Sequence, residues 1–111
     1  MKNEKMKNYE FLKDMYHDGY FPNFLVDKGK DILVDLCNRI EDEKVETLEA
    51  LYILTHQATE KFNDLNEEFE ENGSEIETAA RDSIGESVHY IAVTYGFVDA
   101  DIEELIATRD W

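Results

Sequence analysis

The chain has 111 residues, of which 42% are hydrophobic and 34% are charged, and its formal net charge is −16. This length predicts one domain spanning residues 1–111, and the hydrophobic content is too high for a disordered chain. The negative charge disfavours nucleic acid and anionic membranes as partners, and the single cysteine, Cys37, excludes an internal disulfide bond and favours the reducing cytoplasm.

The first thirty residues differ in charge from the rest of the chain. They contain six lysines and five acidic residues, whereas residues 31–111 contain five basic and 22 acidic residues. The N-terminal stretch lacks the apolar core of a signal peptide, and no apolar run approaches the roughly 20 residues that span a bilayer. We therefore expect a cytoplasmic protein that is strongly acidic after residue 30.

The N-terminal part of the chain predicts one short helix. Residues 1–7 are polar and are expected to fray. Over residues 8–18, Asn8 is a suitable N-cap, and the apolar residues that follow it recur at spacings of three and four. Pro22, the only proline, disfavours helical geometry in the residue before it and marks a boundary.

Aromatic residues are concentrated in the turn around Pro22 and in the helix before it. They are Phe11, Tyr16, Tyr20, Phe21 and Phe24. These rings either plug the end of a helical bundle or form a partly exposed patch that binds a ligand or a protein. Trp111 has the same two interpretations.

Three long helices are predicted after the aromatic turn, over residues 24–43, 47–72 and 75–95. Thr47 is a suitable N-cap for the second of them, and Gly73 follows it where a left-handed C-cap is expected. Because Gly29 in the first helix has no side chain, the aromatic turn or a neighbouring helix could approach it closely.

The third long helix and the last part of the chain also carry capping signals. Ser74 and Glu77 form an S-x-x-E capping box before the third helix, and Gly96 follows its end. Asp99 is expected to cap a last short helix over residues 99–108. The connections between the long helices are short, which makes consecutive helices antiparallel neighbours. The predicted fold class is all-α: an antiparallel bundle of three long helices with a short helix at each end.

The helix over residues 47–72 carries the longest apolar stripe. Its members, spaced alternately by four and three residues, are Leu51, Thr55, Ala58, Phe62, Leu65 and Phe69. This spacing places them on one helix face, which predicts a core seam along the bundle. Ile53 points away from this seam, toward either a covering short helix or a second contact surface. Cys37 lies on the apolar stripe of the preceding helix and is predicted to be a buried thiol.

Two pairs of histidine and glutamate side chains lie one turn apart on predicted helices. They are His56 with Glu60, and Glu86 with His89. Di-iron bundles use two Glu-x-x-His pairs, whereas this chain has one, and both pairs are predicted to face outward, so no metal or cofactor is expected. No nucleophile–histidine or glycine-rich phosphate motif occurs, and the chain is therefore not expected to be an enzyme.

Acidic residues gather where the second long helix ends and the third begins. They are Glu67, Glu68, Glu70, Glu71 and Glu75, with Glu77 close by. This series is either a solvated helix end or a docking surface for a basic protein. In the second case Tyr20 and Phe21 of the aromatic turn are further candidate contact residues.

Four stretches of the chain resemble a bacterial domain-of-unknown-function family of small acidic proteins. They are FLVDK (24–28), LTHQATEK (54–61), EENGSEIET (70–78) and DIEELIATRDW (101–111). The resemblance covers most of the chain from about Tyr9 onward. It implies a bacterial cytosolic protein, and it implies no activity, cofactor or site, because no activity is assigned to the family.

The sequence favours a non-enzymatic interaction protein that presents acidic helical surface to a basic partner. An immunity or inhibitor protein is one concrete form, by analogy of size and charge with the small acidic proteins that neutralise bacterial toxins. The alternative is a helical bundle that binds a small molecule or a metal. The small residues of the third long helix are compatible with either a monomer or a homodimer.

Overall fold

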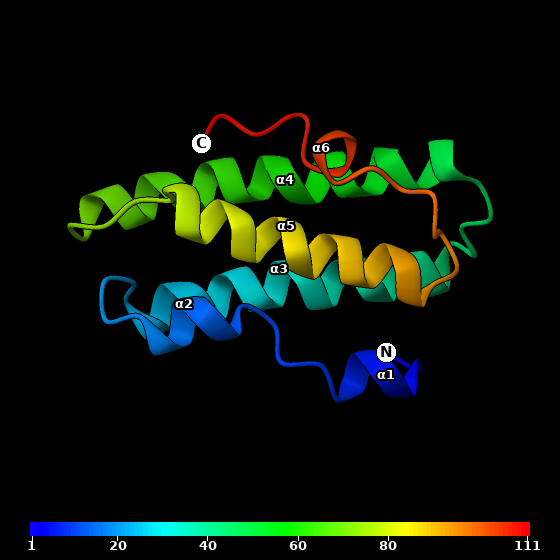
Figure 1. Cartoon of the computed structure of the whole chain (residues 1–111), viewed down its shortest axis with the longest axis horizontal. Helices are drawn as coiled ribbons and strands as arrows, with labels where there is room; N and C mark the ends of the chain where they lie inside the picture. Colours follow the sequence, from blue (N-terminus) through cyan, green and yellow to red (C-terminus); the bar gives the residue numbers. More distant parts are fainter.

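Three long antiparallel helices form the body of the protein in the computed structural model, which describes residues 1–111 (Figure 1). They are α3 (Asn23–Asp42), α4 (Leu48–Glu71) and α5 (Thr78–Thr94). Around them lie the short helices α1 (Glu4–Lys7), α2 (Lys13–His17) and α6 (Ile102–Leu105). The predicted all-α bundle of three long helices with shorter flanking helices is confirmed. No helix is both long and apolar enough to cross a membrane.

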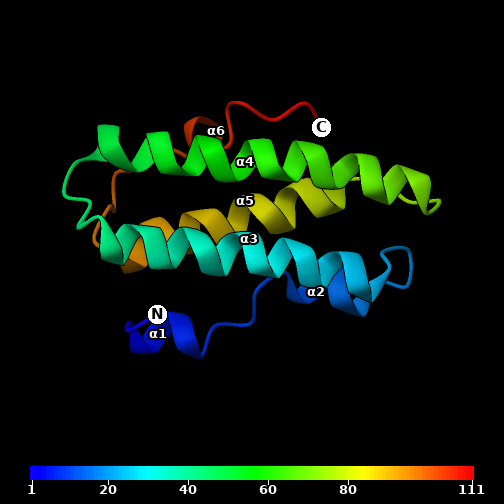
Figure 2. The ribbon, with the colours of Figure 1, turned by 180° about the vertical axis from the view of Figure 1, so that it is seen from behind.

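The core lies between the long helices and extends to all three short ones. Figure 2 shows α3 and α4 side by side along most of their length, with α5 behind them. All six residues of the predicted α4 seam are buried, and Phe62 and Phe69 are at most 1% exposed. The seam is confirmed, because an apolar stripe at this spacing can be buried only along one side of a helix. Ile53, which points away from the seam, is 56% exposed and is not covered by another helix.

Gly29 lies where α3 meets both α4 and the segment before α2. A Cβ atom built at Gly29 would lie 3.0 Å from Leu12 Cδ1 and 3.1 Å from Phe62 Cε1. Both distances are shorter than ordinary van der Waals contacts between carbon atoms. The absence of a side chain therefore lets the neighbouring helix α4 pack closely against α3, as the sequence predicts, and the segment before α2, rather than the aromatic turn, is the second close neighbour.

Both ends of α4 have the predicted caps. The Ala50 amide donates a hydrogen bond to Thr47 Oγ1 at 3.1 Å. At the other end Gly73 has a left-handed backbone, with φ of +77°. The amides of Gly73 and Ser74 donate to the carbonyls of Glu70 and Phe69, which is the Schellman arrangement.

The predicted capping box at the start of α5 is wrong. The helix begins at Thr78, and its N-cap residue, Glu77, makes no side-chain capping bond. Instead, the segment from Ser74 to Glu77 passes the end of α4, where the Ile76 amide donates to Asn66 Oδ1 at 2.7 Å. Ile76 is 4% exposed. Its burial and this tertiary hydrogen bond hold the segment in a conformation that a capping box does not allow.

Residues 1–7, which were expected to fray, are instead attached to the body of the protein. Asn3 caps α1 by accepting a hydrogen bond from the Met6 amide, and Met6 is 1% exposed. The amides of Lys2 and Asn3 donate to the Glu41 carboxylate at 2.7 and 3.2 Å. Burial of one apolar side chain and these two hydrogen bonds to α3 order the segment.

The predicted helix over residues 8–18 is also interrupted. Asn8 ends α1 rather than beginning a helix, and α2 begins only at Lys13. Leu12 has a left-handed backbone, with φ of +56°. This conformation is unfavourable for leucine, but both Phe11 and Leu12 are at most 4% exposed. The burial of two large adjacent side chains accounts for the break.

The Glu41 carboxylate of α3 forms hydrogen bonds with residues just before α1 and just after α5. Besides the two amides of the N-terminal segment, it accepts a hydrogen bond from the Tyr95 hydroxyl. Burial raises the pKa of Glu41, but these three hydrogen bonds outweigh burial and the net pKa is below the ordinary value for glutamate. The ionised form of Glu41 therefore stabilises the folded state.

We expect Glu41→Gln to destabilise the protein by about 1 kcal/mol at neutral pH, because the retained oxygen accepts weaker hydrogen bonds than a carboxylate does. The stabilising effect of Glu41 is complete above its unfolded pKa of about 4.3 and is lost as the pH falls through the lower folded pKa. Urea unfolding at pH 7 and at pH 3 measures this loss. Glu60→Gln, which changes an exposed glutamate with no hydrogen bond, is the control. A Glu41→Gln effect that is equal at both pH values would contradict the prediction.

The predicted C-terminal helix over residues 99–108 is much shorter in the structure. Its cap is Asp101 rather than Asp99, and it ends at Leu105. Residues 106–111, here called the C-terminal strap, run along α4. Asn63 of α4 accepts from the Asp110 amide and donates to the Thr108 carbonyl, at 3.0 and 3.1 Å. Hydrogen bonds to α4 thus take the place of further helical turns.

Candidate functional site

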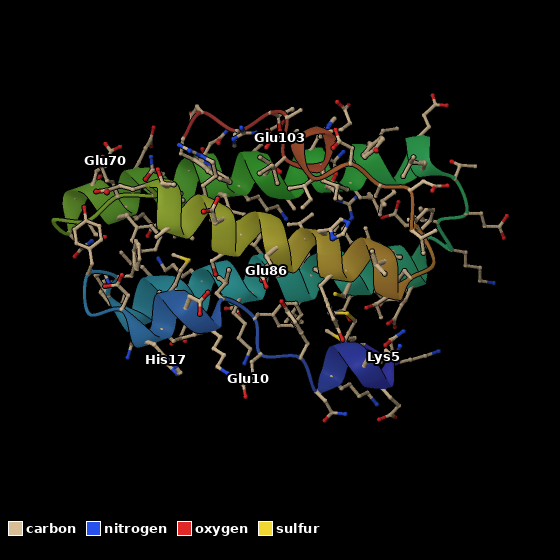
Figure 3. The ribbon with its side chains drawn as sticks, in the orientation of Figure 1. Lys5, Glu10, His17, Glu70, Glu86 and Glu103 are labelled. Atoms are coloured by element: carbon tan, nitrogen blue, oxygen red, sulfur yellow. The ribbon has the colours of Figure 1, made fainter.

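Six glutamates gather at the end of the bundle where α4 finishes and α5 approaches. This surface, here called the acidic end, comprises Glu67, Glu68, Glu70, Glu71, Glu75 and Glu77. All but Glu68 are exposed, and Figure 3 shows Glu70 near this end of the molecule. The structure thus brings the predicted acidic residues together on one end, because the Gly73 turn reverses the chain between the two groups.

Most of the acidic end carries no compensating charge. Glu68 forms an ion pair with Lys28 at 2.5 Å, and none of the other five glutamates has a cationic partner within 4 Å. Glu70 accepts only a neutral hydrogen bond from Asn66, at 3.2 Å. The five unpaired carboxylates therefore leave a concentrated negative potential on this end.

The aromatic turn reaches the acidic end through Tyr20. Its hydroxyl donates a hydrogen bond to Glu77 Oε1 at 2.9 Å. A hydrogen bond and charge repulsion from Glu77 raise the pKa of Glu75, and the repulsion from Glu70 acts in the same direction. An added cation would relieve this repulsion, which makes the region around Glu75 and Glu77 favourable for positively charged groups.

The rings of the aromatic turn differ in exposure: one plugs the end of the bundle and two lie on the surface. Phe21 is 4% exposed and packs edge-on against Phe69, with ring centroids 6.0 Å apart, so it plugs the end of the bundle. Tyr20 and Phe24 are 43% and 56% exposed. Phe21 is therefore a wrong choice as a contact residue, because its ring is buried. Phe24, which the sequence names as part of a possible aromatic patch, lies on the surface instead.

The two histidine–glutamate pairs do not form a metal centre. His56 was expected to face outward, but its Nε2 donates to the Glu104 carbonyl at 2.7 Å, and its ring stacks on Tyr52. Glu60 and Glu86 are exposed. No group of three or more His, Cys, Asp or Glu side chains is arranged to hold a metal ion. The sequence could not indicate the position of His56, because the segment that covers it comes from 48 residues further along the chain.

Cys37 is buried, as predicted. Its side chain is 0% exposed, and burial raises the pKa of the thiol to about 12. The reactive thiolate is therefore scarce at neutral pH, and Cys37 packs as a small apolar side chain.

A second surface feature was not predicted. A cleft of about 620 Å³, here called the N-terminal cleft, opens between α1, the start of α2 and α5. Its lining is mostly polar and includes the stacked rings of Tyr9 and Tyr90, whose centroids are 4.1 Å apart. No sequence pattern indicates this cleft, because it depends on the break in the chain at Leu12 and on the attachment of α1.

Comparison with known proteins identifies the family of this chain. Residues 5–111 match the family described as a family of unknown function, DUF5713. No curated protein matches the chain, and no solved structure matches it either. The match covers all six helices and both surface features described above, apart from the residues before Lys5. The chain therefore belongs to the DUF5713 family.

Proposed function

We propose that this protein is a non-enzymatic interaction module that binds a basic protein through the acidic end. The observation that carries the proposal is the exposed ring of Tyr20, whose hydroxyl binds Glu77, among carboxylates that have no cationic partner. Aromatic residues often dominate the binding energy of protein interfaces, and charged residues around them steer the partner and select it. Neither feature alone would distinguish an interface from ordinary surface.

The arrangement suggests which groups of the partner would be recognised. Lysine or arginine side chains would approach Glu75 and Glu77, where a positive charge relieves the repulsion between neighbouring carboxylates. Apolar groups of the partner would cover the exposed rings of Tyr20 and Phe24. An immunity or inhibitor protein that acts in the bacterial cytoplasm is one form that such a module would take, and this form rests on size and charge.

A matched pair of variants tests the proposal. The acidic-end variant carries Glu67→Gln, Glu70→Gln, Glu71→Gln and Glu75→Gln. The control carries Glu46→Gln, Glu49→Gln, Glu60→Gln and Asp99→Asn, which remove the same charge from exposed residues elsewhere. Each purified protein is used to capture partners from the native cell at low and at moderate salt.

We expect the wild-type protein and the control to retain the same basic protein at low salt, and the acidic-end variant to lose it. Higher salt should weaken capture, because exposed charges separated by more than about 8 Å are screened at physiological ionic strength. The variant Phe24→Ala should also weaken capture while leaving the charge unchanged. Equal capture by the two charge variants, or no captured basic protein at either salt concentration, would refute the proposal.

A further inference from the structure

The N-terminal cleft has the size of a small-ligand site. Its volume of about 620 Å³ lies within the range of roughly 300–1,000 Å³ that is typical of such sites. The cleft lies midway along the body of the protein rather than at the acidic end: in Figure 3, Glu86 lies on the middle of α5, far from Glu70. Binding in the cleft would therefore be independent of the proposed interface.

The inner wall of the cleft offers hydroxyl groups and aromatic rings. Ser83 and Ser87 of α5 line the cleft, although only 6% and 2% of their surfaces are exposed. The Ser83 hydroxyl makes no hydrogen bond with another protein group, so it is free to bind a ligand. Tyr9 and Tyr90 stack with an interplanar angle of 12°, and both line the cleft. These groups favour a ligand that donates hydrogen bonds and that can lie against an aromatic ring.

Two of the four carboxylates that line the cleft form ion pairs with lysines, and the other two do not. Glu4 and Glu10 each have a lysine nearby, Lys7 at 3.7 Å and Lys13 at 3.8 Å. Asp14 of α2 and Glu86 of α5 have no cationic partner within 4 Å, and the negative charge of each acts on the Tyr9 phenol.

Together with burial, these charges raise the pKa of Tyr9. Asp14 and Glu86, which come from different helices, line the cleft together with Tyr9. Lys5, on α1, is the one lysine of the lining without a carboxylate partner.

We propose that the N-terminal cleft binds a primary alkylammonium group between Asp14 and Glu86, against the Tyr9–Tyr90 pair. A primary ammonium has three N–H donors, and Asp14, Glu86 and the free Ser83 hydroxyl offer three acceptors. A quaternary ammonium has the same charge but no N–H donor, so it would leave these acceptors unsatisfied. The alkylammonium group would come from a free polyamine or from a lysine side chain of a basic polypeptide.

The proposal is tested by NMR titration of the full chain with putrescine and with Nα-acetyl-lysine methylamide. Tetramethylammonium and 1,4-butanediol at constant ionic strength are the control ligands. We expect saturable shifts of the Tyr9 and Tyr90 ring signals and of the Ser83 amide with at least one of the two primary amines. Binding of putrescine but not of the lysine derivative would indicate that the ligand is a free polyamine. Binding of the lysine derivative would indicate that the ligand is a lysine side chain of a polypeptide.

Variants separate a specific site from general attraction to an acidic protein. The double variant Asp14→Asn and Glu86→Gln should weaken binding by about tenfold, as expected for the loss of two partly solvated charge pairs. The variant Glu67→Gln and Glu71→Gln removes the same charge at the acidic end and should change the affinity by less than about twofold. All four residues are exposed, so both variants are expected to fold.

Three results would overturn the proposal. The first is equal affinity for tetramethylammonium and for the primary amines, and the second is equal weakening by the two double variants. The third is the absence of saturable shifts at Tyr9, Tyr90 and Ser83. The proposed interface at the acidic end involves other residues and is tested by protein capture. Either proposal can therefore fail while the other holds.

Discussion

Replacing Phe62 by alanine is expected to destabilise the protein by about 3–5 kcal/mol. Phe62 is 1% exposed and lies at the centre of the α4 seam, where its ring packs over Gly29 of α3 and forms a T-shaped pair with Trp111. Removal of the ring loses its transfer free energy and leaves a cavity between two helices and the C-terminal strap. Since small proteins are stable by about 5–15 kcal/mol in all, this loss is a large part of the total.

Urea unfolding followed by circular dichroism measures the effect of Phe62→Ala. Phe24→Ala is the matched control, because it removes the same ring from a residue that is 56% exposed. We expect its effect to be below about 1 kcal/mol, as is usual for surface substitutions. If both variants lose equal stability, Phe62 does not have the central position in the core that the structure gives it.

Replacing Gly29 by leucine is expected to destabilise the protein by about 1–3 kcal/mol. Even the first atom of the new side chain would lie 3.0 Å from Leu12 and 3.1 Å from Phe62. The three atoms beyond it require α4 or the segment before α2 to move away from α3. Leucine is a better helix former than glycine by up to about 1 kcal/mol, so a net loss would show that overpacking is the larger effect.

Gly19→Leu is the control for this substitution, because no atom lies within 4 Å of a Cβ built at Gly19. We expect it to change the free energy of unfolding by less than about 0.5 kcal/mol. Thermal or urea unfolding of both variants gives the comparison. A Gly29→Leu variant as stable as the wild type would contradict the close packing of α3 and α4.

The parts of the fold that the sequence predicts correctly depend on local signals. The alternating spacing along α4 defines its buried face, and the caps at Thr47 and Gly73 define its ends. Each signal lies within one helix or its caps, where neighbouring members are three or four residues apart, so a single sequence contains all of it. The acidic end was equally predictable, since it follows from composition and from one reversal of the chain.

The parts that sequence reasoning misses depend on contacts between distant residues. Glu41 accepts a hydrogen bond from the amide of Lys2, which is 39 residues earlier in the chain. The Ile76 amide donates to Asn66 instead of taking part in a local cap. Phe21 and Phe24 differ in exposure because one precedes the start of α3 and packs on Phe69, whereas the other lies on the outer side of the first turn. No periodicity within a turn distinguishes them.

The covering of α4 by α6 and the C-terminal strap has a consequence for how the chain folds during synthesis. Thr59 donates to the carbonyl of Leu105, 46 residues later, and the His56 carbonyl accepts from the Thr108 hydroxyl, 52 residues later. Helix α4 is therefore synthesised before the residues that cover this flank. At about 5–20 residues per second the synthesis of the intervening residues takes several seconds, and until they are made nothing in the chain protects the flank from a chaperone.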